Sequence, residues 1–180
     1  LTEMVKKRGI LGYGAIGRHA ARLAKALGME IYVHGRAARP TPESRRLDPS
    51  GFSIPGTGDP EGELPSKWFS GAGGLDEFLA SDLDLLVVCV PLTKDTRHLL
   101  SRREFAILQG RRQQRGGKGT FVCNVARGAV IDTDALVEAS VPMSRLGDPA
   151  EIARVMLFLC SNGASYVNGA EIDVNGGQHV

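Results

Sequence analysis

The chain has no apolar run near the roughly 18 residues that a membrane-spanning helix requires, and no segment patterned like a secretory signal. Its three cysteines are odd in number and form no Cys-x-x-Cys pair, which argues against a disulfide framework and against a metal site. Neither sign of charge dominates, because 22 Lys and Arg stand against 20 Asp and Glu. We therefore expect a cytoplasmic globular protein with no membrane and no nucleic-acid partner.

Aromatic residues are also scarce, at 6% of the chain. None of them interrupts the basic residues Arg111, Arg112, Arg115 and Lys118, so this segment lacks the stacking platforms that single-stranded nucleic acids use. We predict a solvated loop there. Cys89 and Cys123 lie in apolar runs, and we expect both in the core.

What the chain does contain is a G-x-G-x-x-G motif at Gly12, Gly14 and Gly17. An apolar strand is predicted before it at residues 8–11, and a second strand follows at residues 30–34. Between the motif and the second strand, apolar residues recur at helical spacing, and a glycine is placed to end the helix. The order strand, glycine-rich turn, helix and strand is typical of a dinucleotide-binding βαβ unit.

The three glycines have separate physical roles. Gly12 permits the tight turn, Gly14 lets the backbone approach a pyrophosphate, and Gly17 lets the helix pack closely on the strand. The helix N-terminus offers unpaired N–H groups to an anion. We therefore predict a dinucleotide site formed by Gly12, Gly14, Ala15, Ile16 and Gly17.

The choice of coenzyme depends on the end of the second strand. An NAD site usually has Asp or Glu there, to accept hydrogen bonds from the ribose hydroxyls. This chain has Gly35, followed by Arg36 and Arg39, whose guanidinium groups suit a ribose phosphate. The residues favour NADP, with NAD as the alternative; the other interpretation of the two arginines is a solvated loop.

Regular elements alternate along the rest of the chain. Strands are predicted at residues 84–90 and 120–125, and helices at residues 74–80, 101–109 and 132–139. Residues 37–70 are rich in proline and glycine, which predicts an insertion without regular structure, either a surface loop or a lid. Strands that alternate with helices indicate an α/β fold, a doubly wound, Rossmann-like parallel sheet in a single domain.

Residues 1–140 are predicted to form the dinucleotide-binding region. The remaining segment, 141–180, is predicted to add a helix and a strand that complete the sheet. Its helix begins at a capping box, with Asp148 as the cap, Pro149 in the first position and Glu151 three residues after the cap. The final strand is predicted at residues 170–174.

Three motifs in order, spread over residues 9–139, closely resemble the cofactor domain of the D-isomer-specific 2-hydroxyacid dehydrogenases. They are the glycine motif, the strand end Val90-Pro91-Leu92-Thr93 with Thr96, and the run Asn124-Val125-Ala126-Arg127-Gly128. The resemblance implies that Val90, Pro91, Thr96, Asn124 and Ala126 lie along the cofactor. It also implies that Arg127 binds the substrate carboxylate beside the nicotinamide, for which a structural ion pair is the alternative.

Residues 142–177 look like the C-terminal end of a short-chain dehydrogenase/reductase. The similar residues are those at 145–153, at 165–169 and at 172–177. The two resemblances together imply a hybrid chain.

The proton donor of either family has no counterpart in the sequence. The 2-hydroxyacid family uses a histidine tuned by a glutamate, and none of His19, His34, His98 and His179 follows a strand with such a partner. The short-chain family uses a tyrosine with a lysine four residues later. No tyrosine of this chain has a lysine there.

We therefore expect an NADP-binding oxidoreductase domain that is catalytically incomplete. By resemblance, its substrate is a small 2-keto or 2-hydroxy acid. The alternatives are a non-catalytic nucleotide-binding module, a homo-oligomer that associates through residues 148–174, and a short-chain-reductase-like hybrid.

Overall fold

The computed structural model describes residues 7–48, 54–114, 120–140, 145, 147–168, 170 and 172–174. The chain divides into two compact units, Leu1–Asp132 and Thr133–Val180, whereas the sequence predicted one domain. The reason is that the sheet and the helices between its strands lie entirely before residue 133. Among the described residues, no helix combines the length and the apolar composition that crossing a membrane requires.

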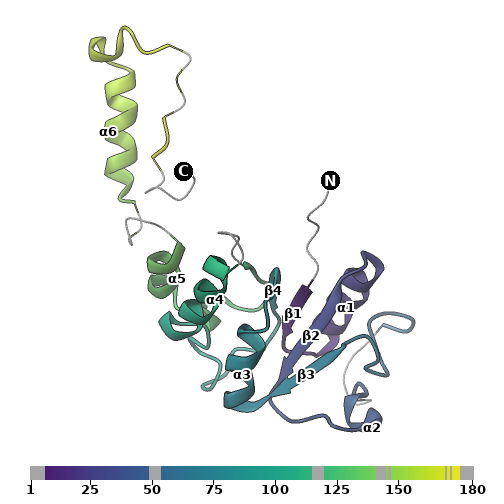
Figure 1. Cartoon of the computed structure of the whole chain (residues 1–180). Coiled ribbons are helices and arrows are strands. Elements are labelled where there is room, and N and C mark those ends of the chain that lie inside the picture. The colour runs from purple at the N-terminus through teal and green to yellow at the C-terminus, as the bar shows by residue number, and fades with distance from the viewer. Residues whose placement is uncertain are drawn as a thin grey trace. The chain divides into compact units, whose positions relative to one another are not determined.

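The first unit is built on a five-stranded parallel sheet in the order β3-β2-β1-β4-β5. Its strands are β1 (Lys7–Leu11), β2 (Glu30–Gly35), β3 (Lys67–Ser70), β4 (Leu85–Val88) and β5 (Phe121–Asn124). Helix α1 (Ala15–Ala26) lies on one side of the strands, and α3 (Gly71–Leu79) and α4 (Arg102–Gln114) lie on the other (Figure 1). This arrangement confirms the predicted doubly wound, Rossmann-like fold.

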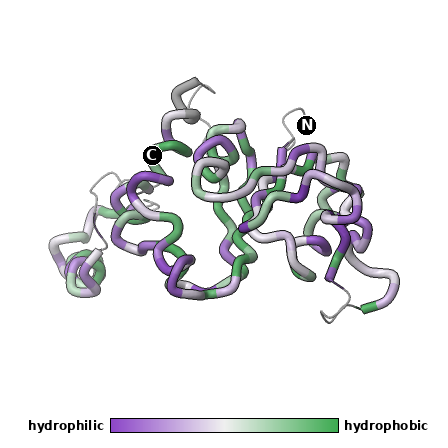
Figure 2. The backbone as a smooth tube through the Cα atoms, turned by 90° about the horizontal axis from the view of Figure 1, so that it is seen from below, coloured by the Kyte–Doolittle hydropathy of each residue, from purple (hydrophilic) through white to green (hydrophobic). Residues whose placement is uncertain are grey.

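The central strands form the core because both of their faces are covered. Ile10, Ile31, Val33, Leu86 and Val88 are fully buried. Helix α1 adds small residues that allow close packing. Figure 2 shows hydrophobic stretches, in green, between hydrophilic ones along the chain. Continuous apolar strands of this kind are typical of a parallel sheet between two helical layers.

The segment 37–70 is not free of regular structure, so that part of the prediction is wrong. It contains the short helix α2 (Pro42–Arg45) and all of β3. The helix forms because Thr41 and Ser44 make a reciprocal capping box and Pro42 occupies the first turn. Strand β3 forms because its backbone pairs with β2 from Tyr32 to Gly35. Hydrogen bonds to a neighbouring strand, and not local composition, decide its structure.

Two further expectations in the first unit need correction. Cys123 is exposed, because it lies in β5 at the end of the strand order, whereas Cys89 is half-buried as a residue beside the core. Helix α4 continues to Gln114, so the predicted basic loop begins inside a helix. The rest of that predicted loop, at residues 115–119, lies outside the described residues.

The second unit contains α5 (Thr133–Ser140), α6 (Pro149–Leu159) and the short 3-10 helix η2 (Asn162–Ala164). The capping box of α6 is confirmed. The Asp148 side chain accepts the Glu151 N–H, and the Glu151 carboxylate accepts the Asp148 N–H. The predicted strand at 170–174 is wrong for residues 170 and 172–174, which lie outside any strand. A strand requires a hydrogen-bonded neighbour, and the described sheet contains none for them. That residues 141–180 complete the sheet stays a prediction.

Candidate functional site

The carboxyl ends of four strands meet at one edge of the sheet. Leu11 of β1 pairs in register with His34 of β2 and with Val88 of β4, and Val88 pairs with Asn124 of β5. Every predicted site residue lies at Asn124 or in the short segments that follow these four positions. Since neighbouring strands lie about 4.8 Å apart, the sheet brings the predicted residues to a common edge.

The glycine-rich turn has the geometry that its sequence predicted. Gly12 has φ +97°, a conformation that favours glycine, and its N–H donates to the His34 carbonyl at 2.9 Å. A Cβ at Gly17 would lie 2.2 Å from the Gly12 carbonyl oxygen, so only glycine allows α1 to approach the turn this closely. The turn is therefore fixed by β2 on one side and by its own helix on the other.

Gly14 faces open space. A Cβ built there would meet no atom within 4 Å, and Gly14, Ala15 and Ile16 are all exposed. Gly14 is the N-cap of α1, and no side chain caps the helix. The first N–H groups of a helix have no partner within it, so they are available to an anion at this point. The pyrophosphate of a dinucleotide fits these residues, because it needs an open approach and N–H donors.

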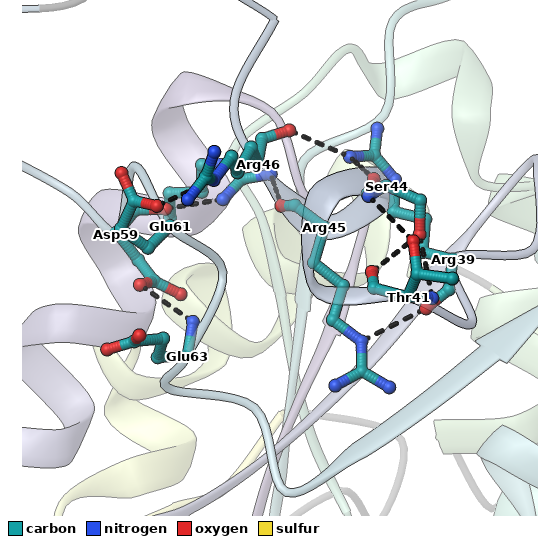
Figure 3. A network of polar contacts seen from close by, with 9 residues as sticks. Arg39, Thr41, Ser44, Arg45, Arg46, Asp59, Glu61 and Glu63 are labelled. Atoms are coloured by element: carbon teal, nitrogen blue, oxygen red, sulfur yellow. Dashed lines mark hydrogen bonds and ion pairs between the residues drawn. The ribbon is translucent and has the colours of Figure 1, made fainter.

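The two arginines after β2 differ in their surroundings. Arg36 is exposed, and among the described residues no group accepts a hydrogen bond from its guanidinium. Arg39 is half-buried, and its Nη1 donates to the carbonyls of Ser44 at 2.9 Å and Arg46 at 3.2 Å. Figure 3 shows Arg39 beside Thr41 and Ser44, at helix α2. Arg36 is therefore the freer of the two to bind a phosphate.

The segment after β4 forms a compact turn. The Thr96 hydroxyl donates to the Pro91 carbonyl at 2.6 Å and accepts the Thr93 N–H at 2.7 Å. Val90 contacts the glycine turn, since a Cβ at Gly12 would lie 2.9 Å from its side chain. The turn after β4 thus packs directly beside the glycine turn.

The side chain of Asn124 holds the segment after β5 in place. The Asn124 Oδ1 accepts the Ala126 N–H, and its Nδ2 donates to the Arg127 carbonyl, both at 3.0 Å. Arg127 is exposed, and its Nη1 bonds only to the neighbouring Ala126 carbonyl at 3.1 Å. No carboxylate of the described residues pairs with Arg127, so the alternative of a structural ion pair has no support in this part of the chain.

His34 lies at this edge and the His98 N–H donates to the Ala129 carbonyl after β5, but no described histidine side chain is hydrogen-bonded to a carboxylate. Burial lowers the pKa of His34, and its Nε2 lies 2.9 Å from the Gly71 carbonyl, so the ring serves as a neutral hydrogen-bond donor. His19 is an exposed residue of α1, and His98 is exposed in the turn before α4. His179 lies outside the described residues.

A set of buried polar residues next to the glycine turn was not predicted from the sequence. Tyr13 lies inside the motif, Arg18 follows it, and Asp59 lies far along the chain, yet the Tyr13 hydroxyl donates to Asp59 Oδ2 at 2.7 Å. A tyrosine between two glycines carries no signal of such a partner. Asp59 belongs to a proline- and glycine-rich segment, where an aspartate normally indicates only a turn.

A parallel sheet with a glycine-rich turn open to an anion, flanked by the ends of three other strands, defines a dinucleotide-binding domain. The family model for the D-isomer specific 2-hydroxyacid dehydrogenase NAD binding domain matches residues 3–53 and 65–141. The chain belongs to this family.

The proteins similar to this chain include a glyoxylate reductase and a solved 2-hydroxyacid dehydrogenase. Glyoxylate reductase of Thermococcus gammatolerans is 32% identical over 134 residues, which are 74% of this chain and 31% of that protein. A D-isomer specific 2-hydroxyacid dehydrogenase of Xanthobacter autotrophicus, solved with NADPH, is 28% identical with a TM-score of 0.54, over 74% of this chain and 33% of that one. The chain thus spans about a third of the length of these relatives.

A second family model, that of enoyl-(acyl carrier protein) reductase, matches residues 124–179. The protein FixR of Bradyrhizobium diazoefficiens is 57% identical over 49 residues, which are 27% of this chain and 18% of that protein.

Proposed function

We propose that the first unit binds NADP(H) for hydride transfer to or from a small 2-keto or 2-hydroxy acid. The observation that carries the proposal is the open space at Gly14, beside an uncapped helix N-terminus and among the four registered strand ends. When bound, the nicotinamide coenzyme donates or accepts the hydride. The matched residues hold it: the glycine turn binds the pyrophosphate, and the turns after β4 and β5 lie along it. The substrate class is supported by the names of the relatives.

Arg127 is proposed to bind the substrate carboxylate. Its guanidinium is exposed at the end of β5 and has no carboxylate partner in the described part of the chain. A planar guanidinium binds a carboxylate through two parallel hydrogen bonds. Because no described histidine is hydrogen-bonded to a carboxylate, we propose that the chain binds coenzyme and acid without efficient turnover. We also propose that residues 142–177 derive from a short-chain reductase, which the second family match supports.

The preference for NADP over NAD is proposed to rest chiefly on Arg36, with Arg39 contributing its charge. The change Arg36→Ala should raise the Kd for NADPH about tenfold, because it removes charge-assisted hydrogen bonds to the ribose phosphate. The Kd for NADH should change little, because NADH lacks that phosphate. Calorimetric titration of the full chain with both coenzymes measures the two constants.

Arg154→Ala is the matched control, since Arg154 is another exposed arginine, on α6. It removes the same net charge, and we expect no change in either Kd. Equal affinities of the unchanged chain for NADPH and NADH contradict the choice of coenzyme. An absence of binding to both contradicts the proposed function.

Self-association is a second candidate function, which one observation favours. Helix α6 exposes a run of large apolar side chains: Met156 is 61% exposed, Leu157 70% and Phe158 48%. Contiguous exposed apolar residues of this size often mark an interface.

Sedimentation of the full chain beside a Met156→Glu, Leu157→Glu double variant tests the association. We expect the unchanged chain to sediment as an oligomer and the variant as a monomer, because two carboxylates at a buried interface carry a large desolvation cost. A monomeric unchanged chain at high concentration contradicts this candidate.

A further inference from the structure

Three polar side chains form a buried cluster behind the glycine turn, here called the Asp59 cluster: Tyr13, Arg18 and Asp59. Their exposed fractions are 7%, 1% and 6%. Buried charged groups of this kind are costly unless they are paired and hydrogen-bonded. The cluster joins a residue of the motif itself, a residue of α1 and a residue of the segment before β3.

The Asp59 carboxylate accepts three hydrogen bonds. Oδ2 accepts the Tyr13 hydroxyl at 2.7 Å and the Leu64 N–H at 3.1 Å, and Oδ1 accepts the Glu63 N–H at 3.0 Å. Burial, with the hydrogen bond to Asp59 as the second cause, raises the pKa of Tyr13, so its hydroxyl keeps the proton that it donates. Figure 3 shows the Asp59 carboxylate hydrogen-bonded to the Glu63 N–H.

Arg18 binds the same segment from α1. Its guanidinium lies 4.7 Å from the centre of the Tyr13 ring, and it donates to the carbonyls of Asp59 and Arg45. Its charge compensates that of the Asp59 carboxylate. The Tyr13 ring also packs edge-on against Trp68 of β3, at 5.2 Å between ring centres. Segment 54–70 is therefore part of the body behind the turn, and not a separate lid.

We propose that Asp59 is a positioning residue for coenzyme binding. It fixes the glycine turn through the Tyr13 hydroxyl and acts without touching the coenzyme. Gly12 and Gly14 adjoin Tyr13 in the chain, so a Tyr13 held in one place holds the backbone that meets the pyrophosphate. A preorganised turn loses less conformational freedom when it binds. This inference rests on the proposed function, because it concerns the affinity of the same site.

The experiment is a titration of the full chain with NADPH, followed through the fluorescence of Trp68, the single tryptophan. Asp59→Asn places an amide N–H group against a donor, and Tyr13→Phe removes only the hydroxyl. We expect each change to raise the Kd about five- to tenfold, because a turn that is no longer held in place loses more conformational freedom when it binds. The double variant should have a Kd no higher than that of the weaker-binding single variant, because both changes break the same hydrogen bond.

Two controls separate positioning from a general loss of stability. Glu61→Gln breaks the exposed ion pair with Arg46 in the same segment, where Arg46 Nε and Glu61 Oε2 lie 2.8 Å apart. Leu75→Ala empties a buried position of α3 and lowers the melting temperature. At a temperature where every variant is folded, both controls should keep the Kd of the unchanged chain within about twofold.

The inference is overturned if the unchanged chain binds NADPH and Tyr13→Phe binds it equally well. It is also overturned if the Kd of Leu75→Ala rises as much as that of Asp59→Asn, because affinity then follows stability alone. If Asp59→Asn does not fold, Tyr13→Phe and hydrogen exchange at the Gly12 and Gly14 amides decide, with faster exchange expected. An unchanged chain that binds no NADPH removes the proposed function, and the inference with it.

Discussion

Gly17 lies where α1 begins to pack on the end of β1. A Cβ at this position would lie 2.2 Å from the Gly12 carbonyl oxygen and 3.1 Å from the side chain of Ile10. Because the first neighbour is backbone, the clash is relieved only by moving α1 away from the strand. We expect Gly17→Ala to lower the free energy of unfolding by about 1–3 kcal/mol, the usual cost of overpacking, as measured by urea denaturation.

Gly110→Ala is the control with the opposite expected sign. Gly110 is a helical residue of α4, and an added Cβ meets nothing within 4 Å. Alanine there should stabilise the chain by about 0.5–1 kcal/mol, because glycine loses more conformational freedom in a helix. A Gly17→Ala chain as stable as the Gly110→Ala chain contradicts the close approach of α1.

Individual residues were predictable where a backbone rule acts locally. The glycines of the motif were found because their spacing follows from the turn, the ligand approach and the helix contact. The bond between Tyr13 and Asp59 was not predictable, because it joins residues far apart in the chain, from a segment whose composition indicates only turns. The exposure of Cys123 was missed for a related reason: an apolar strand does not reveal that it lies at the edge of its sheet.

Among the elements, helix α6 carries the clearest local signal. The Glu151 carboxylate accepts two hydrogen bonds from Arg145 at 2.7 Å and the Asp148 N–H at 2.8 Å. These bonds lower the pKa of Glu151 from 4.5 to about 2, and the bonds from Arg145 are the largest cause. A lowered carboxyl pKa means that the capping box stabilises α6 above pH 4.5 and is lost as the pH falls from 4.5 through about 2.

An NMR titration of the Glu151 side-chain carbon tests this account of the helix start. We expect an apparent pKa of about 2 in the unchanged chain and a value closer to 4.5 in Arg145→Gln, which removes the first-named cause. Amide exchange in the first turn of α6 should accelerate over the same pH range. A pKa near 4.5 in the unchanged chain means that the Arg145 bonds are not formed in solution.

Elements were predictable where composition and caps agree. Helices α1, α3 and α6 and strands β1, β2 and β4 follow from apolar periodicity together with glycine, proline or capping residues. The four-residue strand β3 was missed because it exists through its pairing with β2. The strand predicted at 170–174 shows the converse, since suitable composition did not produce a strand at the described residues.

At the scale of the whole molecule, the sheet ends at β5 among the described residues. Phe121 at the start of that strand is 73% exposed, and Val125 just after it is 47% exposed. The chain spans about a third of the length of its relatives. All the groups proposed to hold the coenzyme belong to the first unit. Arg127, also in this unit, is the one charged residue proposed to bind the acid.

The central claim is that a dinucleotide lies against the N-terminus of α1, in the space that Gly14 leaves open. Gly14→Ala tests it most directly, because a Cβ there meets no protein atom within 4 Å and the backbone, at φ −86°, suits alanine. We predict that the variant loses no more than about 1 kcal/mol of stability, the scale of an N-cap change. Its Kd for NADPH in a calorimetric titration should rise at least about tenfold, because the methyl group occupies the place of the pyrophosphate. A Gly14→Ala chain that binds NADPH as tightly as the unchanged chain would contradict the account.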